Sequence, residues 1–213
     1  RAVVTGFDTQ SVLLGGSQSA SGNGGNITLT SSGSISTSGN YSHGLVLQTL
    51  GGGGGLYTSD ATTNQPSFTL RSDNTGSGGD ISGQHNGTIS IDGYKTVGVL
   101  LQTAGGGGGV IDGAFRGSAG GQGNSGKINF KMNGTIDAQG TNPVGIFAQS
   151  AAGSEKQGDI NLQASGQQGD INLELTKNHS IKTNMTGIGV QFSGGNQNTL
   201  INNGQVIAAS PAG

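Results

Sequence analysis

Apolar and polar residues alternate in short runs along this chain of 213 residues. A first series of runs reads NITLT (26–30), DISG (80–83), KINF (127–130) and DINL (170–173). A second series follows it as GSIST (33–37), GTISI (87–91), GTIDA (134–138) and HSIKT (179–183). An apolar residue at every second position is typical of a β-strand with one buried face, and helical spacing is not sustained anywhere. The pattern therefore predicts short strands separated by turns rich in Gly, Ser and Asn.

A third series closes each group of runs and carries a glutamine. It reads HGLVLQTLGGGGG (43–55), GVLLQTAGGGGG (98–109), GIFAQSAAG (145–153) and, less closely, GIGVQFSGG (187–195). By parity the inward-facing pairs are Leu45 and Leu47, Val99 and Leu101, Ile146 and Ala148, and Ile188 and Val190. The residue between each pair is expected to face solvent. The glutamines are expected to point outward as well, or to lie at a bend where the amide bonds free backbone groups; they are Gln48, Gln102, Gln149 and Gln191.

These runs form a repeat, since the glutamines recur at intervals of 54, 47 and 42 along the chain. The units are approximately 22–75, 76–123, 124–166 and 167–213, with 1–21 as the end of a preceding repeat. A strand with one apolar stripe cannot bury it alone, whereas equivalent strands stacked about 4.8 Å apart do so. We therefore predict an all-β fold, a single-stranded right-handed parallel β-helix that runs as one continuous solenoid over 1–213. Each repeat of 42–54 residues would hold about two rungs of the β-helix. An antiparallel β-sandwich is the alternative, but it does not explain a multi-strand unit repeated in the same order.

Composition narrows the classes of function. The chain has 45 glycines, 30% hydrophobic and 4% aromatic residues, which argues against a large compact core. A disordered linker would share this composition, but it has no need of regularly placed Ile, Leu and Val. A net charge of −2 with nine scattered basic residues does not suit a nucleic-acid binder. The absence of cysteine excludes disulfides and thiolate metal sites, and no apolar run is long enough for a membrane-spanning helix.

Two long stretches carry a resemblance to a known family. GGNITLTSSGSISTSGNYSHGLVLQTLGGGGG and its echo GGDISGQHNGTISIDGYKTVGVLLQTAGGGGG resemble the passenger domains of large autotransporters (type V secretion) and haemagglutinin-like adhesins of Gram-negative bacteria. The segment NTLINNGQVIAA (198–209) is similar to a rung of the same family. The resemblance covers nearly the whole chain, but it is compositional and periodic, so it bears on fold more than on activity. It implies export across the outer membrane to the cell surface or the medium. Membrane attachment would occur only through a C-terminal translocator, which we expect this passenger segment not to include.

No catalytic, cofactor-binding or metal site is predicted. The patterns of a serine-protease nucleophile, a phosphate loop and a calcium-binding nonapeptide repeat are not matched. The histidines precede strands and are expected to be structural; they are His43, His85 and His179. Three aspartates also recur just before strands, where we expect Asx-type turns rather than an acidic or calcium-binding ladder; they are Asp80, Asp159 and Asp170.

The sequence therefore predicts a non-enzymatic, rigid adhesin stalk that presents contact loops. The loops expected are 50–66, 104–126 and 150–158, and Tyr57 and Phe115 are the aromatic residues expected to make contacts there. The expected partner is a glycan or protein on a host or environmental surface, or another copy of the chain, and no cofactor is expected. A β-helical polysaccharide lyase or hydrolase is the alternative, and it would need carboxylates or a basic residue gathered on one face.

Overall fold

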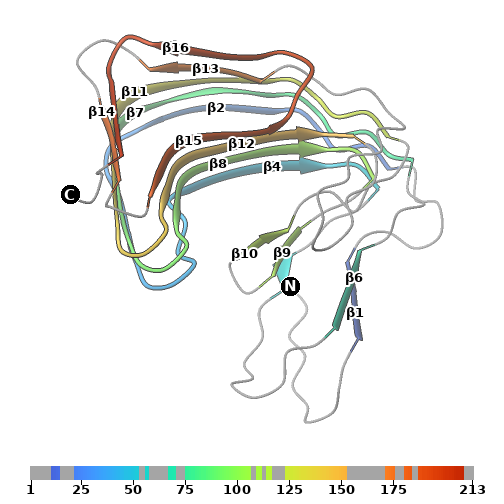
Figure 1. Cartoon of the computed structure of the whole chain (residues 1–213). Helices are drawn as coiled ribbons and strands as arrows, with labels where there is room; N and C mark the ends of the chain where they lie inside the picture. Colours follow the sequence, from blue (N-terminus) through green and yellow to red (C-terminus); the bar gives the residue numbers. More distant parts are fainter. Residues whose placement is uncertain are drawn as a thin grey trace.

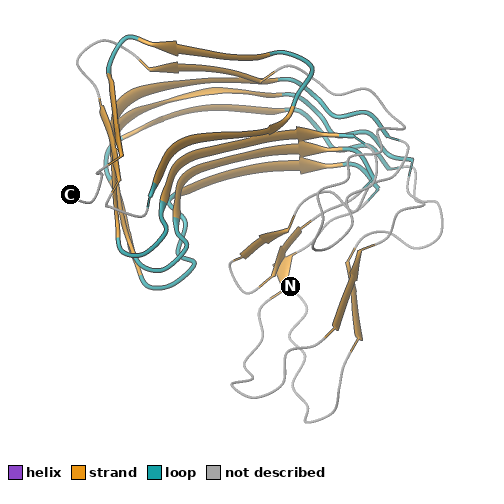
Figure 2. Ribbon diagram, in the orientation of Figure 1, coloured by secondary structure: helices purple, strands orange, loops and turns teal. Residues whose placement is uncertain are grey.

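The computed structural model describes 11–14, 22–52, 56–57, 67–70, 75–106, 109–111, 114–116, 123–152, 171–175, 180–183 and 187–208. Every regular element in these residues is a β-strand (Figure 2). The all-β prediction is therefore confirmed. The strands form two principal sheets and two small ones (Figure 1).

The larger principal sheet has eight strands. They are β2 (Ile27–Ser32), β3 (Ile35–Ser38), β7 (Ile81–Asp92), β11 (Ile128–Gln139), β13 (Ile171–Leu175), β14 (Ser180–Thr183), β16 (Asn198–Asn202) and β17 (Gln205–Ala208). The second principal sheet has the order β15-β12-β8-β4. Its strands are β4 (Leu45–Leu50), β8 (Val97–Ala104), β12 (Val144–Ala151) and β15 (Ile188–Gly194). All pairs within these two sheets are parallel.

The two small sheets come from segments outside the three series of runs. β1 (Ser11–Leu14) pairs in parallel with β6 (Ser67–Leu70). β5 (Leu56–Tyr57), β9 (Gly109–Ile111) and β10 (Ala114–Arg116) form a three-stranded sheet in which only the β9–β10 pair is antiparallel. These segments therefore pair with one another rather than with the principal sheets.

Equivalent residues of successive repeats are direct neighbours in the sheets. Ile27 pairs with Ile81, Ile81 with Ile128, and Ile128 with Ile171. Parallel pairing in register lets identical side chains form continuous rows. The prediction of about two rungs per repeat is wrong for the described residues, because two rungs would place equivalent residues two strands apart. We call the three strand segments of one repeat a copy, and its parts the first, second and third segments.

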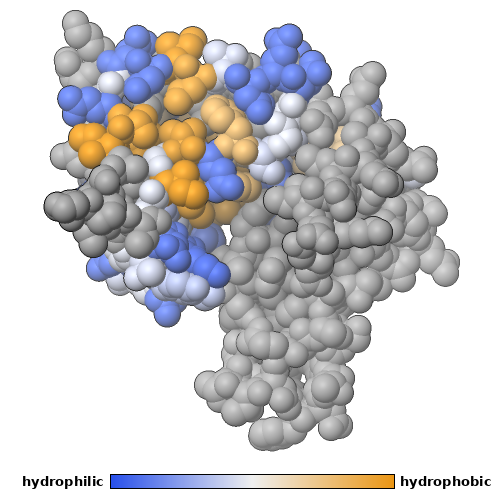
Figure 3. All heavy atoms as spheres, viewed as in Figure 1, coloured by the Kyte–Doolittle hydropathy of each residue, from blue (hydrophilic) through white to orange (hydrophobic). Residues whose placement is uncertain are grey.

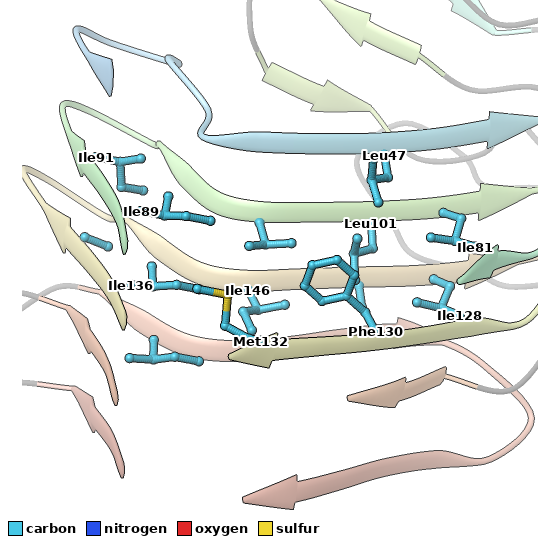
Figure 4. Close-up of a cluster of buried hydrophobic side chains, with 14 residues drawn as sticks. Leu47, Ile81, Ile89, Ile91, Leu101, Ile128, Phe130, Met132, Ile136 and Ile146 are labelled. Carbon is cyan, nitrogen blue, oxygen red and sulfur yellow. The ribbon is translucent and has the colours of Figure 1, made fainter. Parts of the chain in front are cut away.

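The core lies between the two principal sheets, and both contribute to it. Ile81 and Ile89 of the large sheet and Val99 and Leu101 of the four-stranded sheet belong to one buried cluster (Figure 4). Because a fully buried aliphatic side chain contributes about 1.5–3 kcal/mol, these short rows supply the main stabilising term. The alternation in the sequence thus marks the buried face correctly in the first three copies.

The fourth copy is shifted relative to the sequence alignment. Val190 pairs with Ile146, and Phe192 pairs with Ala148. The inward pair is therefore Val190 and Phe192, whereas Ile188, which was expected to be buried, is 46% exposed. The shift is by two residues, so the inward parity is kept, but Ile188 falls in the row of Val144 at the start of the edge strand β15, where no further strand among the described residues covers it.

The outward position of the third segment is only partly exposed. Val46 is 42% exposed as predicted, but Leu100 is 0% exposed. Leu100 lies in the middle of a row, with Val46 on one side and Phe147 on the other. Leu100 lies on a central strand, where large side chains on both neighbouring strands reduce its contact with solvent. The prediction that this position faces solvent is therefore wrong at Leu100.

Candidate functional site

The turn between the second and third segments has an unusual backbone. Tyr41, Lys95 and Asn142 occupy equivalent places in three copies, and their φ angles are 58°, 53° and 54°. A positive φ is uncommon outside glycine; it is tolerated by Asn and unfavourable for a bulky side chain. Strained residues of this kind gather at functional sites, so an observed outlier is a reason to look for a function there.

Two aromatic rings come together at this turn. The centroids of Tyr41 and Tyr94 lie 5.7 Å apart with the ring planes at 79°, an edge-to-face arrangement. Nζ of Lys95 lies 5.0 Å from the centroid of the Tyr94 ring, within the range of a cation–π contact. Both tyrosines are partly exposed and Lys95 is exposed. We call Tyr41, Tyr94 and Lys95 the turn patch.

Hydrogen bonds between copies hold the turn patch in place. The backbone N–H of Tyr41 donates to the carbonyl of Tyr94 at 2.9 Å, and that of Lys95 donates to the carbonyl of Thr141 at 2.8 Å. The N–H of Tyr94 donates to Oδ1 of Asn40 at 3.1 Å. The patch is therefore preorganised by main-chain contacts to the neighbouring copies, which lowers the ordering cost of binding.

The patch combines three kinds of contact. A tyrosine offers an apolar ring face together with a hydroxyl, and Lys95 adds a positive charge beside one ring. Such a surface suits a ligand with apolar and hydroxyl groups on one side, such as a sugar ring, or a protein side chain.

The aromatic residues predicted to make contacts lie elsewhere. Tyr57 is in β5, paired with Ile111, and Phe115 is in β10, paired with Val110. The structure thus brings both to one three-stranded sheet, in neighbouring rows on either side of β9. Most of the predicted loops 50–66 and 150–158 lies outside the described residues, whereas the described part of 104–126 includes β9 and β10.

Comparisons with protein-family models, with curated proteins and with solved structures gave no match.

The histidines differ from one another in their surroundings. His85 faces the core, is 1% exposed, and bonds Oγ of Ser31 through Nδ1 at 2.9 Å. Its Nε2 is buried without a hydrogen-bond partner, and burial lowers the pKa of His85 below its usual range. His43 accepts a hydrogen bond at Nδ1 from the N–H of Val97 at 3.0 Å, as a structural role requires. His179 lies outside the described residues.

Asp80 binds a backbone N–H group, though not within its own turn. Its Oδ1 accepts from the N–H of Lys127 at 2.8 Å, while its own N–H donates to Oδ1 of Asn26 at 2.9 Å. The Asp80 side chain therefore links two successive copies, whereas the predicted Asx-type turn would have bonded a backbone N–H group of its own turn. Asp159 and Asp170 lie outside the described residues.

The glutamines form a ladder that sequence reasoning missed. Nε2 of Gln48 donates to Oε1 of Gln102 at 2.6 Å, and Nε2 of Gln102 donates to Oε1 of Gln149 at 2.7 Å. Nε2 of Gln149 donates to Oγ of Ser193 at 3.3 Å, whereas Gln191 lies beside Phe147 and is exposed. Gln102 and Gln149 are 0% and 2% exposed, so the expected outward, solvated side chain is wrong for both. Identical polar residues at in-register positions were the available signal.

In the first three copies the residue after the glutamine closes the corner toward the next copy. Oγ1 of Thr103 donates to the carbonyl of Gly79 at 2.8 Å and accepts from the N–H of Gly126 at 2.8 Å. The glycine that begins the next run, Gly105, lies so close to Gly123 that an added Cβ would collide with its carbonyl group. The recurring Gln-Thr and glycine run is thus a structural corner in the described residues.

Among the described residues, no group of three or more His, Cys, Asp or Glu side chains could hold a metal ion. The same part of the chain contains no helix long and apolar enough to cross a membrane.

Proposed function

We propose that the chain is a segment of a right-handed parallel β-helix that acts as a rigid stalk of an exported, autotransporter-like adhesin. The observation that supports this most strongly is the in-register pairing of like residues from successive repeats, such as Ile35 with Ile89, Ile89 with Ile136 and Ile136 with Ile181. Such pairing suits a structure that lengthens by stacking like units. In this proposal the stalk stands on the cell surface or is released into the medium.

The proposed contact role belongs to the turn patch. Its rings lie in adjacent copies, and its backbone is fixed before a ligand arrives. A glycan or a protein surface is the proposed ligand, because a partly exposed aromatic pair with a neighbouring cation can stack and donate hydrogen bonds at once. Tyr57 and Phe115 remain candidates for a second contact region.

Binding to arrayed glycans and immobilised matrix proteins tests the contact role. Tyr94→Ala should lower the affinity about fivefold or more, since it removes both the ring pair and the cation–π contact. Tyr94→Phe should retain most of the binding, and Val46→Ala serves as the matched control on another exposed surface. Equal binding by the parent chain and Tyr94→Ala to every ligand that the parent binds would refute the contact role.

Cryo-electron microscopy tests the stalk independently. We expect parallel strands about 4.8 Å apart winding as one right-handed coil. The β-helix would be excluded by antiparallel strands, or by two facing sheets between which the chain does not wind as a coil. Either result would leave the binding measurements on the turn patch unaffected.

A further inference from the structure

Two of the three tyrosines in the chain face each other across successive copies. Tyr41 lies in the turn between β3 and β4, and Tyr94 lies in the equivalent turn between β7 and β8. Their ring centroids are 5.7 Å apart and their planes meet at 79°. The third tyrosine, Tyr57, is in β5 and pairs with Ile111 in the small three-stranded sheet. The stacking of the copies therefore brings this pair of tyrosine rings together.

Main-chain hydrogen bonds fix the positions of both residues. The N–H of Tyr41 donates to the carbonyl of Tyr94 at 2.9 Å, and the N–H of Tyr94 donates to Oδ1 of Asn40 at 3.1 Å. Because the two backbones are already joined in this way, rotation about the side-chain bonds is enough to turn the edge of one ring toward the edge of the other. Groups that are held together before a reaction behave as if they were present at very high concentration.

Both rings can be reached from solvent. Each of the two tyrosines is partly exposed, and Figure 3 shows hydrophilic and near-neutral residues on the surface where these turns lie in Figure 1. The chain has no cysteine, which oxidants commonly attack first, and no tryptophan. Met132 is 0% exposed, so its thioether is shielded from oxidants. The two tyrosines are therefore accessible side chains that can lose an electron to an oxidant.

We propose that Tyr41 and Tyr94 form an oxidative cross-linking site, at which a one-electron oxidant joins the two rings as a dityrosine. Each phenol loses one electron and one proton and becomes a phenoxyl radical. The two radicals then form a carbon–carbon bond between the ring positions ortho to their hydroxyl groups. The hydrogen on each of these carbons moves to the phenolic oxygen as a proton, which restores both phenols. With a peroxidase and hydrogen peroxide as the oxidant, one peroxide takes up the two electrons and two protons and becomes two molecules of water.

The cross-link would fasten the first copy to the second. In the next copy Thr141 and Asn142 stand at the equivalent turn, so the link cannot be repeated there. A covalent bond between residues far apart in the sequence stabilises a fold by restricting the unfolded chain, as a disulfide does. The dityrosine would supply this restraint in a chain that has no cysteine.

The first test is oxidation of the full chain, in dilute solution, by a peroxidase and hydrogen peroxide. Trypsin cleaves after Arg71 and Lys95, so it places the two tyrosines on different peptides. We expect a joined pair of peptides that is lighter by two hydrogens than the sum of the separate peptides, together with the blue fluorescence of dityrosine. Tandem mass spectrometry of the joined pair assigns the two linked residues.

Phenylalanine variants identify the rings that react. Tyr41→Phe and Tyr94→Phe keep the ring packing but cannot form a phenoxyl radical, and each should lower the yield of dityrosine within one chain about tenfold or more. Tyr57→Phe is the matched control and should leave the yield unchanged. The cross-link and the contact role of the turn patch can fail separately, because Tyr94→Phe should retain most of the ligand binding while it loses the cross-link.

Urea and dilution show whether the fold brings the rings together. The yield within one chain should fall in urea, where the copies no longer hold the rings, and it should not depend on protein concentration. The purified cross-linked chain should have a urea midpoint higher by about 1 M. The proposal is overturned if dityrosine forms only between chains, if Tyr41→Phe and Tyr57→Phe give equal yields, or if the yield in urea equals that of the folded chain. An unchanged urea midpoint would show that the link does not fasten the two copies together.

Discussion

His85 should make the stability of this protein fall in mild acid. The imidazole lies in the core row between Ser31 and Met132 and is 1% exposed. Nδ1 bonds Ser31, so in either tautomer Nε2 remains without a partner. Protonation would create a buried positive charge with an unsatisfied N–H, and neither row neighbour carries a charge that could offset it.

Proton binding to the folded and unfolded states determines the direction and size of this change in the free energy of unfolding. Burial lowers the pKa of His85 in the folded protein, whereas the unfolded chain titrates near about 6.5. Below that value the unfolded state binds more protons, so the free energy of unfolding decreases as the pH falls. The decrease is about 1.4 kcal/mol per pH unit while folded His85 stays neutral, and it ends once the folded state also takes up the proton. Above about pH 7 this residue should contribute no pH dependence.

Urea denaturation at a series of pH values measures the effect. The midpoint of the parent chain should fall by about 0.5 M per pH unit below the unfolded-state pKa, if the slope of unfolding is about 3 kcal/mol per M. His85→Asn keeps a side chain that can bond Ser31 and cannot titrate. Since the other ionisable groups are common to both proteins, the difference between the two profiles isolates His85. If the urea midpoints of the parent chain and His85→Asn change equally between about pH 7 and 5, His85 does not cause the loss of stability in acid.

Five further substitutions, two of them controls, test the corner and the core. Thr103→Val leaves the carbonyl of Gly79 and the N–H of Gly126 unsatisfied and should cost about 2 kcal/mol or more of unfolding free energy, while Thr103→Ser retains the hydroxyl and most of the stability. Gly105→Ala forces a Cβ against a carbonyl and should cost about 1–3 kcal/mol, measured in the same urea titration. Ile136→Ala, at a fully buried position, should cost about 2–5 kcal/mol, and exposed Ile207→Ala should change stability by less than about 0.5 kcal/mol. Equal losses from the paired variants would contradict the burial and hydrogen bonding described for these sites.

The strands and their stacking partners could be predicted from the sequence, because both depend on local periodicity. Ile27, Ile81 and Ile128 align by spacing alone, and they pair in the structure. Parity also marks Val99 and Leu101 as core residues correctly.

The features that failed depend on contacts between copies. Parity cannot show that Gln102 is buried, because its burial comes from row neighbours and from hydrogen bonds to Gln48 and Gln149. The two-residue shift of β15 lies in its register against β12, which a repeated motif does not reveal. Tyr41 and Tyr94 fall at different places of their repeats, so an alignment of equivalent positions does not bring them together, although the folded turn does.

The number of residues between paired strands varies along this chain, whereas the distance between neighbouring strands does not. Ile27 pairs with Ile81, Ile128 with Ile171, and Ile171 with Asn198, and the stretch of chain between the partners becomes shorter from each of these pairs to the next. Each pairing nevertheless advances the sheet by the same distance of about 4.8 Å. Residues gained or lost between the third segment of one copy and the first segment of the next therefore change the number of residues between paired strands, and leave the pairing register unaltered. Variation in that stretch can alter the surface of the protein without a compensating change in the sheets.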